Sequence, residues 1–146
     1  MQDRSSRILM HHYRNPVANR LLDYPNGESE RRNPLCGDEI HVQLKISDDN
    51  EIEEIGWQAK GCMLVTSSAS ILSEMLKGKK LDHARDIAGS VLDWLQTQER
   101  RGSKPEHDSD RLTGDLAAFN QMSQYPARIP CIKLAWQAFL DATTQD

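Results

Sequence analysis

The feature that most constrains the fold is a change in hydrophobic period at Gly61. Apolar residues alternate with polar ones along 40–46 and again, after the turn-forming SDDN segment, along 52–59, which is typical of half-buried strands. From 65 to 76 the apolar residues recur at helical spacing instead. The alternation of apolar and polar residues shifts by one position between Ile52 and Ile55. This shift predicts a bulge in the second strand of a hairpin.

Helical patterns occupy most of the remaining chain. We expect a short helix through 5–13, a long helix over 81–99, a short helix in TGDLAAFNQM and a terminal helix in IKLAWQAFLDA. The segments NRLLDYPNGESERRNP and ERRGSKPEHDSDR lack apolar periodicity and are predicted to be a turn-rich connection and an exposed loop. Strands early and helices later predict an α+β fold, a small antiparallel sheet packed on one face by helices, in a single domain spanning 1–146.

Composition and charge exclude several classes of function. The chain has 18 Lys+Arg against 22 Asp+Glu, and its basic residues are scattered or lie beside acids, which argues against nucleic acid as a partner. Its apolar runs are short, so we expect no membrane-spanning helix, no secretory leader and a cytoplasmic location. In a reducing compartment the widely spaced Cys36, Cys62 and Cys131 remain thiols.

Each cysteine falls at the predicted end of a strand or helix. Cys36 precedes the first strand, Cys62 opens a helix, and Cys131 lies near the start of the terminal helix, where the helix dipole favours a thiolate. Together with Asp38 they would supply three sulfurs and one oxygen, a set that suits zinc or an iron-sulfur unit. From spacing alone, buried structural thiols remain the alternative, because zinc ligands usually come in close pairs.

Four stretches carry a resemblance to a known family. The segments HHYRNP, NPLCGDEI, KGCMLVTSSASILSEMLKGK and PARIPCIKLAW resemble, in this order, the U-type iron-sulfur cluster assembly proteins (IscU, the NifU N-terminal domain and SufU). An insertion around 100–122 containing LTGDLAAF, and the ending ARIPCIKLAW, resemble the SufU branch. The IscU branch would carry a histidine in place of Pro130 and an LPPVK motif, both of which this chain lacks. The resemblance implies an IscU-type fold.

The resemblance also implies a site and a partner. Cys36, Asp38, Cys62 and Cys131 would hold one zinc ion with no histidine ligand, and Arg128 would hydrogen-bond to the anionic site. A PLP-dependent, SufS-like cysteine desulfurase would dock there, its histidine replacing one thiolate on the metal. The freed thiolate would accept persulfide sulfur. Cys36 is the expected acceptor, with Cys131 as the alternative because IscU-like relatives favour the last cysteine.

Three functions follow as hypotheses. The first is a zinc-dependent sulfurtransferase that relays persulfide sulfur to a downstream scaffold. The second is a scaffold on which a [2Fe-2S] cluster is assembled by the same four ligands and passed to apo-proteins. The third is a structural zinc domain that only binds another protein. Outside the site, we expect His12 to pack against the domain, His11 to face water, and Trp57, Trp94 and Trp136 to lie in the core.

Overall fold

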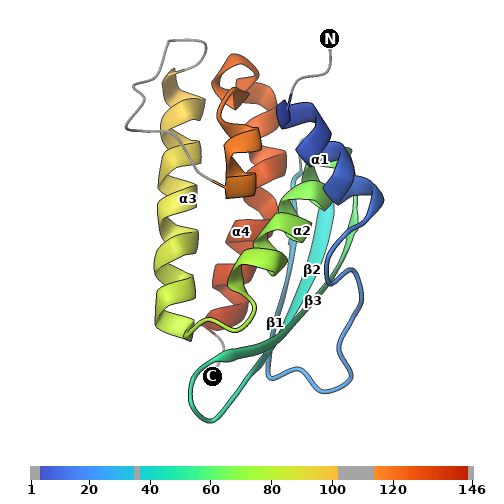
Figure 1. Cartoon of the computed structure of the whole chain (residues 1–146), viewed down its shortest axis with the longest axis vertical. Helices are drawn as coiled ribbons and strands as arrows, with labels where there is room; N and C mark the ends of the chain where they lie inside the picture. The colour runs from blue at the N-terminus through green and yellow to red at the C-terminus, as the bar shows by residue number, and fades with distance from the viewer. Residues whose placement is uncertain (1–3, 35–36, 102–113, 145–146) are drawn as a thin grey trace.

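The computed structural model describes residues 4–34, 37–101 and 114–144 (Figure 1). Their strands form a three-stranded antiparallel sheet in the order β1-β2-β3. None of the helices in this part of the chain is long and apolar enough to cross a membrane. The elements are α1 (Arg4–Arg14), β1 (Gly27–Arg32), β2 (Glu39–Ile46), β3 (Ile52–Lys60), α2 (Met63–Leu76), α3 (Leu81–Arg101), η2 (Gly114–Phe119), η3 (Met122–Gln124), η4 (Pro126–Arg128) and α4 (Ile129–Thr143).

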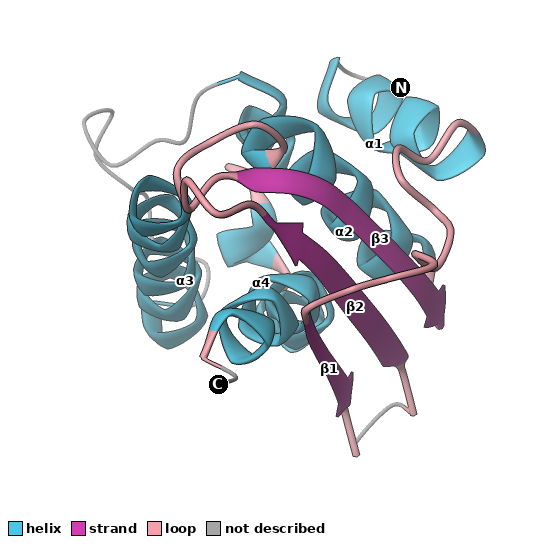
Figure 2. Cartoon of the chain, turned by 90° about the horizontal axis from the view of Figure 1, so that it is seen from below, coloured by secondary structure: helices cyan, strands magenta, loops and turns pink. Residues whose placement is uncertain are grey.

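The hairpin of β2 and β3 confirms the predicted strands and their bulge. Lys45 pairs with Glu54, but the next residue, Ile46, pairs with Ile52, so Glu53 is an extra residue in the returning strand. This insertion restores the apolar phase, and the alternating apolar residues of both strands lie on one face of the sheet. Helices α2 and α4 cover that face (Figure 2). The α+β fold predicted from the sequence is therefore confirmed.

Strand β1 was not predicted, and the expectation of a turn-rich connection over its residues is wrong. Its inward positions are Gly27, Ser29 and Arg31, which show no apolar alternation. The strand is held instead by pairing with β2 and by polar contacts to α4. Ser29 Oγ donates a hydrogen bond to the Ala138 carbonyl (2.5 Å), and Arg31 Nε donates to Asp141 Oδ2 (2.6 Å). Such contacts leave no hydrophobic period for sequence reasoning to detect.

The connection from α1 to β1 covers the free edge and outer face of β3. The backbone N–H of Trp57 donates to the Ala18 carbonyl (3.2 Å), and its indole N–H donates to the Val17 carbonyl (2.8 Å). Further along, the connection passes over Gly56, where an added Cβ would lie 3.0 Å from Leu22 Cδ2. Covering an edge strand in this way satisfies its unpaired backbone groups.

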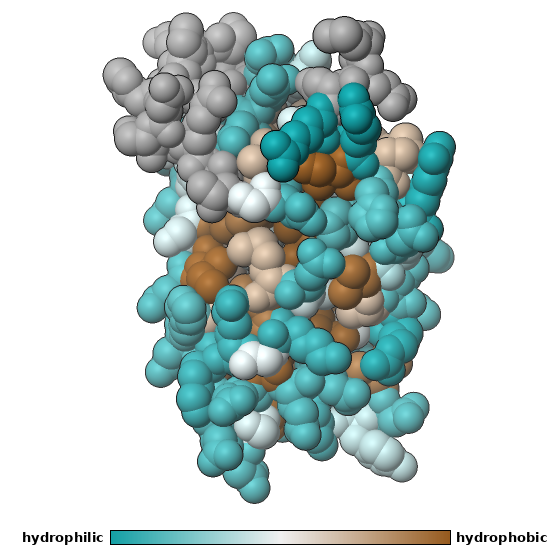
Figure 3. All heavy atoms as spheres, viewed as in Figure 1, coloured by the Kyte–Doolittle hydropathy of each residue, from teal (hydrophilic) through white to brown (hydrophobic). Residues whose placement is uncertain are grey.

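The helices form a core that extends beyond the sheet. Helix α3 packs against α4, and α1 packs against α2 (Figure 2). Trp57 and Trp136 are buried as predicted, at 2% and 0% exposure, whereas Trp94 is only partly buried against the core. Hydrophobic residues still show in the middle of the helical face, between hydrophilic margins (Figure 3).

Two segments of the chain bear on the remaining predictions of secondary structure. The TGDLAAFNQM segment contains the 3-10 helix η2 in place of the expected short helix, and its last residue, Met122, begins η3. The first three residues of the predicted exposed loop, 99–101, belong to α3 instead, and the rest of that loop, 102–111, lies outside the described residues.

Candidate metal centre

Three of the four predicted ligands come together in the fold. Asp38, Cys62 and Cys131 each offer a ligand atom, and these atoms lie within 4.8 Å of one another. Cys62 Sγ lies 3.7 Å from Asp38 Oδ2. They come from a turn before β2, the start of α2 and the start of α4. The fourth predicted ligand, Cys36, lies outside the described residues.

Cys62 is the N-cap residue of α2. Its backbone is extended (φ −76°, ψ 172°), and its side chain makes no capping hydrogen bond. The Cys62 carbonyl accepts the backbone N–H of Val65 (3.2 Å), which starts the helix. The thiol is exposed, and instead of capping its own helix it contacts Asp38 Oδ2.

Cys131 is the third residue of α4 and directly follows Pro130. The first turn of a helix tolerates proline, because the backbone N–H groups of that turn have no acceptor within the helix. The side chain is buried, at 8% exposure. Burial raises the pKa of the Cys131 thiol, and the nearby Asp38 and Cys62 raise this pKa further. The expectation that the helix dipole would favour a thiolate at Cys131 is therefore wrong, and a cation that binds here must displace the thiol proton.

Asp38 is buried at 5% exposure and is positioned by a tight turn. The Gly37 N–H donates to the Asn33 carbonyl (2.8 Å), and the Asn33 N–H donates to the Asp38 carbonyl (2.7 Å). Gly37 has φ +77°, a conformation that favours glycine. The Asp38 carboxylate also packs against Gly61, where an added Cβ would lie 2.7 Å from Asp38 Cγ. In the sequence, Gly61 marked only the change from strand to helix periodicity, and no local pattern indicated its contact with Asp38.

The donor set and its spacing fit zinc. In a tetrahedral site, a Zn–S bond of about 2.3 Å and a Zn–O bond of about 2.1 Å separate the two ligand atoms by about 3.6 Å. The observed separation of Cys62 Sγ and Asp38 Oδ2 is 3.7 Å. Two thiols and one carboxylate leave one tetrahedral position for a fourth ligand. The predicted fourth ligand is Cys36. Iron also accepts thiolates, so the donor set alone does not choose between the two metals.

Arg128, the predicted supporting residue, is exposed at the end of η4, three residues before Cys131. Its role at the site remains a prediction.

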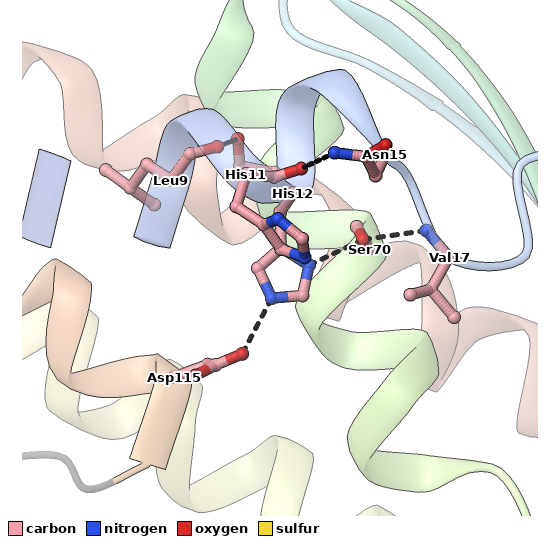
Figure 4. Close-up of polar contacts among 8 residues, drawn as sticks. Leu9, His11, His12, Asn15, Val17, Ser70 and Asp115 are labelled. Carbon is pink, nitrogen blue, oxygen red and sulfur yellow. Dashed lines mark hydrogen bonds and ion pairs between the residues drawn. The ribbon is translucent and has the colours of Figure 1, made fainter. Parts of the chain in front are cut away.

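A second group of metal-ligating side chains lies apart from the first. His12, Glu74 and Asp115 bring ligand atoms within 4.8 Å of one another. His12 Nε2 lies 2.7 Å from Asp115 Oδ2, and His12 Nδ1 lies 2.7 Å from Ser70 Oγ (Figure 4). Two ligands on one zinc ion would lie about 3.3 Å apart, so the His12–Asp115 contact has the length of a hydrogen bond. This group joins α1, α2 and η2, and the predicted packing of His12 is confirmed by its 2% exposure.

Replacing His12 by alanine is expected to lower the free energy of unfolding by about 2–3 kcal/mol, because two hydrogen bonds are lost and the Ser70 hydroxyl loses a buried partner. Urea denaturation measures this loss. The matched control is His11→Ala, because His11 is the exposed neighbour on the same helix and its replacement should change stability by less than about 0.5 kcal/mol. Equal effects of the two variants would contradict the prediction.

The fold and the candidate site define a class of protein. The class is a small α+β domain in which two thiols and a carboxylate from separate elements converge in a set of ligands suited to a metal ion or cluster. The family model of the NifU-like N-terminal domain matches residues 4–132. The chain belongs to this family, the U-type proteins of iron-sulfur cluster assembly, as its sequence motifs predicted.

Known relatives support both the sequence and the fold assignments. The chain is 30% identical, over 90% of its length and 84% of the relative's, to the zinc-dependent sulfurtransferase SufU of Bacillus subtilis. It is 32% identical to the iron-sulfur cluster assembly scaffold protein IscU of Streptococcus pyogenes, over 75% of this chain and 64% of that protein. The crystal structure of a putative SUF-system scaffold protein from Fervidobacterium islandicum superposes with a TM-score of 0.77 at 19% identity, covering 92% of this chain and 93% of that one.

Proposed function

We propose that this protein is a zinc-dependent sulfur acceptor in iron-sulfur cluster assembly. It takes persulfide sulfur from a PLP-dependent, SufS-like cysteine desulfurase onto Cys36 and relays that sulfur to a downstream scaffold or apo-protein in the cytoplasm. Cys36, Asp38, Cys62 and Cys131 hold the zinc ion. The observation that carries the proposal is the convergence of Asp38, Cys62 and Cys131 within 4.8 Å, in a chain similar to a zinc-dependent sulfurtransferase.

The residues of the site suit this chemistry. A bound zinc ion would keep the thiols deprotonated without supplying redox chemistry. The Cys36 thiolate attacks the terminal sulfur of the desulfurase persulfide. The bond between the two persulfide sulfurs breaks, the desulfurase cysteine leaves as a thiolate, and Cys36 becomes the persulfide. No net oxidation occurs, because one disulfur bond is exchanged for another.

The site has a buried side and an exposed side, which supports docking of a partner on the exposed side. Asp38 and Cys131 are buried, whereas Cys62 is exposed, so a partner can approach one side of the site while the other side stays packed. Arg128 is exposed on η4 close in sequence to Cys131, and its guanidinium would favour an anionic group brought to the site.

Persulfide transfer onto Cys36 is tested by mass spectrometry. The zinc-loaded protein is incubated with a cysteine desulfurase and L-cysteine, and we expect an addition of about 32 daltons for each sulfur atom transferred to a thiol. Peptide mapping should place this sulfur on Cys36. The variants Cys36→Ala and Cys131→Ala form a matched pair, because each removes one proposed ligand. Only Cys36→Ala should abolish the addition, and the opposite result would make Cys131 the acceptor.

The scaffold alternative is supported by relatives that are named as assembly scaffolds, and it predicts a different experimental result. Anaerobic reconstitution with iron and sulfide would then give a brown protein that donates its cluster to an apo-ferredoxin. A colourless protein that holds one zinc ion and accepts persulfide sulfur favours the relay. A metal that cannot be removed without unfolding the chain would favour a purely structural zinc domain.

A further inference from the structure

Helix α2 carries three fully buried serines close to the proposed metal centre, Ser67, Ser68 and Ser70. A buried hydroxyl is costly unless it is hydrogen-bonded, and each of these has a partner on another part of the chain. Ser67 Oγ donates to the Leu9 carbonyl on α1 (2.9 Å). Ser68 instead contacts α4, the helix that carries Cys131.

Ser68 makes two hydrogen bonds to α4. Its hydroxyl donates to the Ile132 carbonyl (2.8 Å) and accepts the indole N–H of Trp136 (3.0 Å). Ile132 directly follows Cys131 in the chain, and Trp136 lies about one helical turn later. Both partners are fully buried. One hydroxyl therefore attaches the first two turns of α4 to α2.

The same two helices carry both cysteines of the described site. Cys62 caps α2 six residues before Ser68, about 9 Å along the helix. The separation of the two sulfurs therefore depends on how far α4 slides or rotates against α2. Apolar packing tolerates small shifts, whereas hydrogen bonds are directional and set both the translation and the rotation of α4.

We propose that Ser68 is a positioning residue that holds Cys131 at metal-binding distance from Cys62. Its effect on zinc binding rests on the proposed function, but its effect on the distance between the two thiols does not. Ser68 acts through the α4 backbone and does not itself contact the ion.

The decisive comparison is between Ser68→Ala and Ser67→Ala. Each variant removes a fully buried hydroxyl that donates to a helix carbonyl, and both should lower the urea midpoint. Ser68→Ala should lower it more, because it also leaves the Trp136 indole N–H without its acceptor. Only Ser68→Ala should weaken zinc affinity, by about 10–100-fold, as loss of a residue that orients ligands does. Ser67→Ala should stay within about threefold of the wild-type affinity. The thiolate charge-transfer band of the cobalt-substituted protein should weaken in Ser68→Ala alone.

A second readout needs no metal. In a Cys36→Ser background, oxidation of the metal-free protein by diamide should join Cys62 to Cys131, because their sulfurs lie within 4.8 Å. Ser68→Ala should slow formation of this disulfide about tenfold or more, and Ser67→Ala should not. If Ser68→Ala does not fold, Trp136→Phe replaces it, since that variant removes one of the two bonds and should give a smaller change in the same direction.

The outcomes separate the two proposals. Equal zinc affinities and equal oxidation rates in Ser68→Ala and Ser67→Ala would overturn the positioning role, even if the wild type binds zinc tightly. A wild type that binds no zinc would overturn the proposed function. The oxidation rates would still decide the role of Ser68.

Discussion

Replacing Asp38 by asparagine is expected to weaken zinc binding by about 100-fold. A four-ligand zinc site binds with about 10–16 kcal/mol in total, so one ligand contributes about 3 kcal/mol, which is a factor of about 100 in the dissociation constant. Asparagine keeps the size of the side chain but removes its charge, and a neutral amide is a poor zinc ligand. Competition with a chromophoric chelator measures the dissociation constant.

The matched control for this variant is Asp141→Asn. Asp141 is also a carboxylate, but it forms an ion pair with Arg31 on the sheet and is not in the group of converging ligands. We expect it to leave zinc affinity unchanged and to alter stability by about 1 kcal/mol or less. If Asp38→Asn binds zinc as tightly as Asp141→Asn does, Asp38 is not a ligand.

Replacing Gly61 by alanine is expected to damage both stability and zinc binding. Gly61 has φ +155°, and a Cβ added there would lie 2.7 Å from Asp38 Cγ and closer still to the carboxylate oxygen. The strained backbone should cost about 1–3 kcal/mol of stability. Because Asp38 is short and buried, its carboxylate must shift from its present position beside Cys62, which should weaken zinc binding about 10–100-fold. Urea denaturation and chelator competition measure the two effects.

Two other glycines provide controls for Gly61→Ala. Gly89 lies within α3 with no atom near its added Cβ, so Gly89→Ala should raise the free energy of unfolding by about 0.5–1 kcal/mol. A Cβ on Gly56 would collide with the Arg20 carbonyl. Gly56→Ala should therefore destabilise the sheet without weakening the zinc affinity of the folded protein. If Gly61→Ala behaves like Gly56→Ala, its contact with Asp38 does not affect the metal.

Sequence reasoning predicted those elements whose burial follows a regular period. The hairpin, its bulge at Glu53 and the helices α2, α3 and α4 were predicted correctly, because local alternation or helical spacing reports directly on which side chains are buried. Strand β1 was missed because its inward positions are glycine, serine and arginine. The serine and the arginine make polar contacts with α4. Those contacts join residues more than a hundred positions apart, so no local pattern contains them.

The ligand types, and their places at the ends of strands and helices, were determined by the sequence alone, since turn and helix signals are local. Whether Asp38, Cys62 and Cys131 meet was decided by the tertiary structure, through the packing of α2 on α4 and the turn before β2. The same is true of the contact of Gly61 with Asp38 and of the bonds from Ser68 to α4. The physical reason is that a distance between two elements depends on the side chains packed between them, and those come from distant parts of the chain.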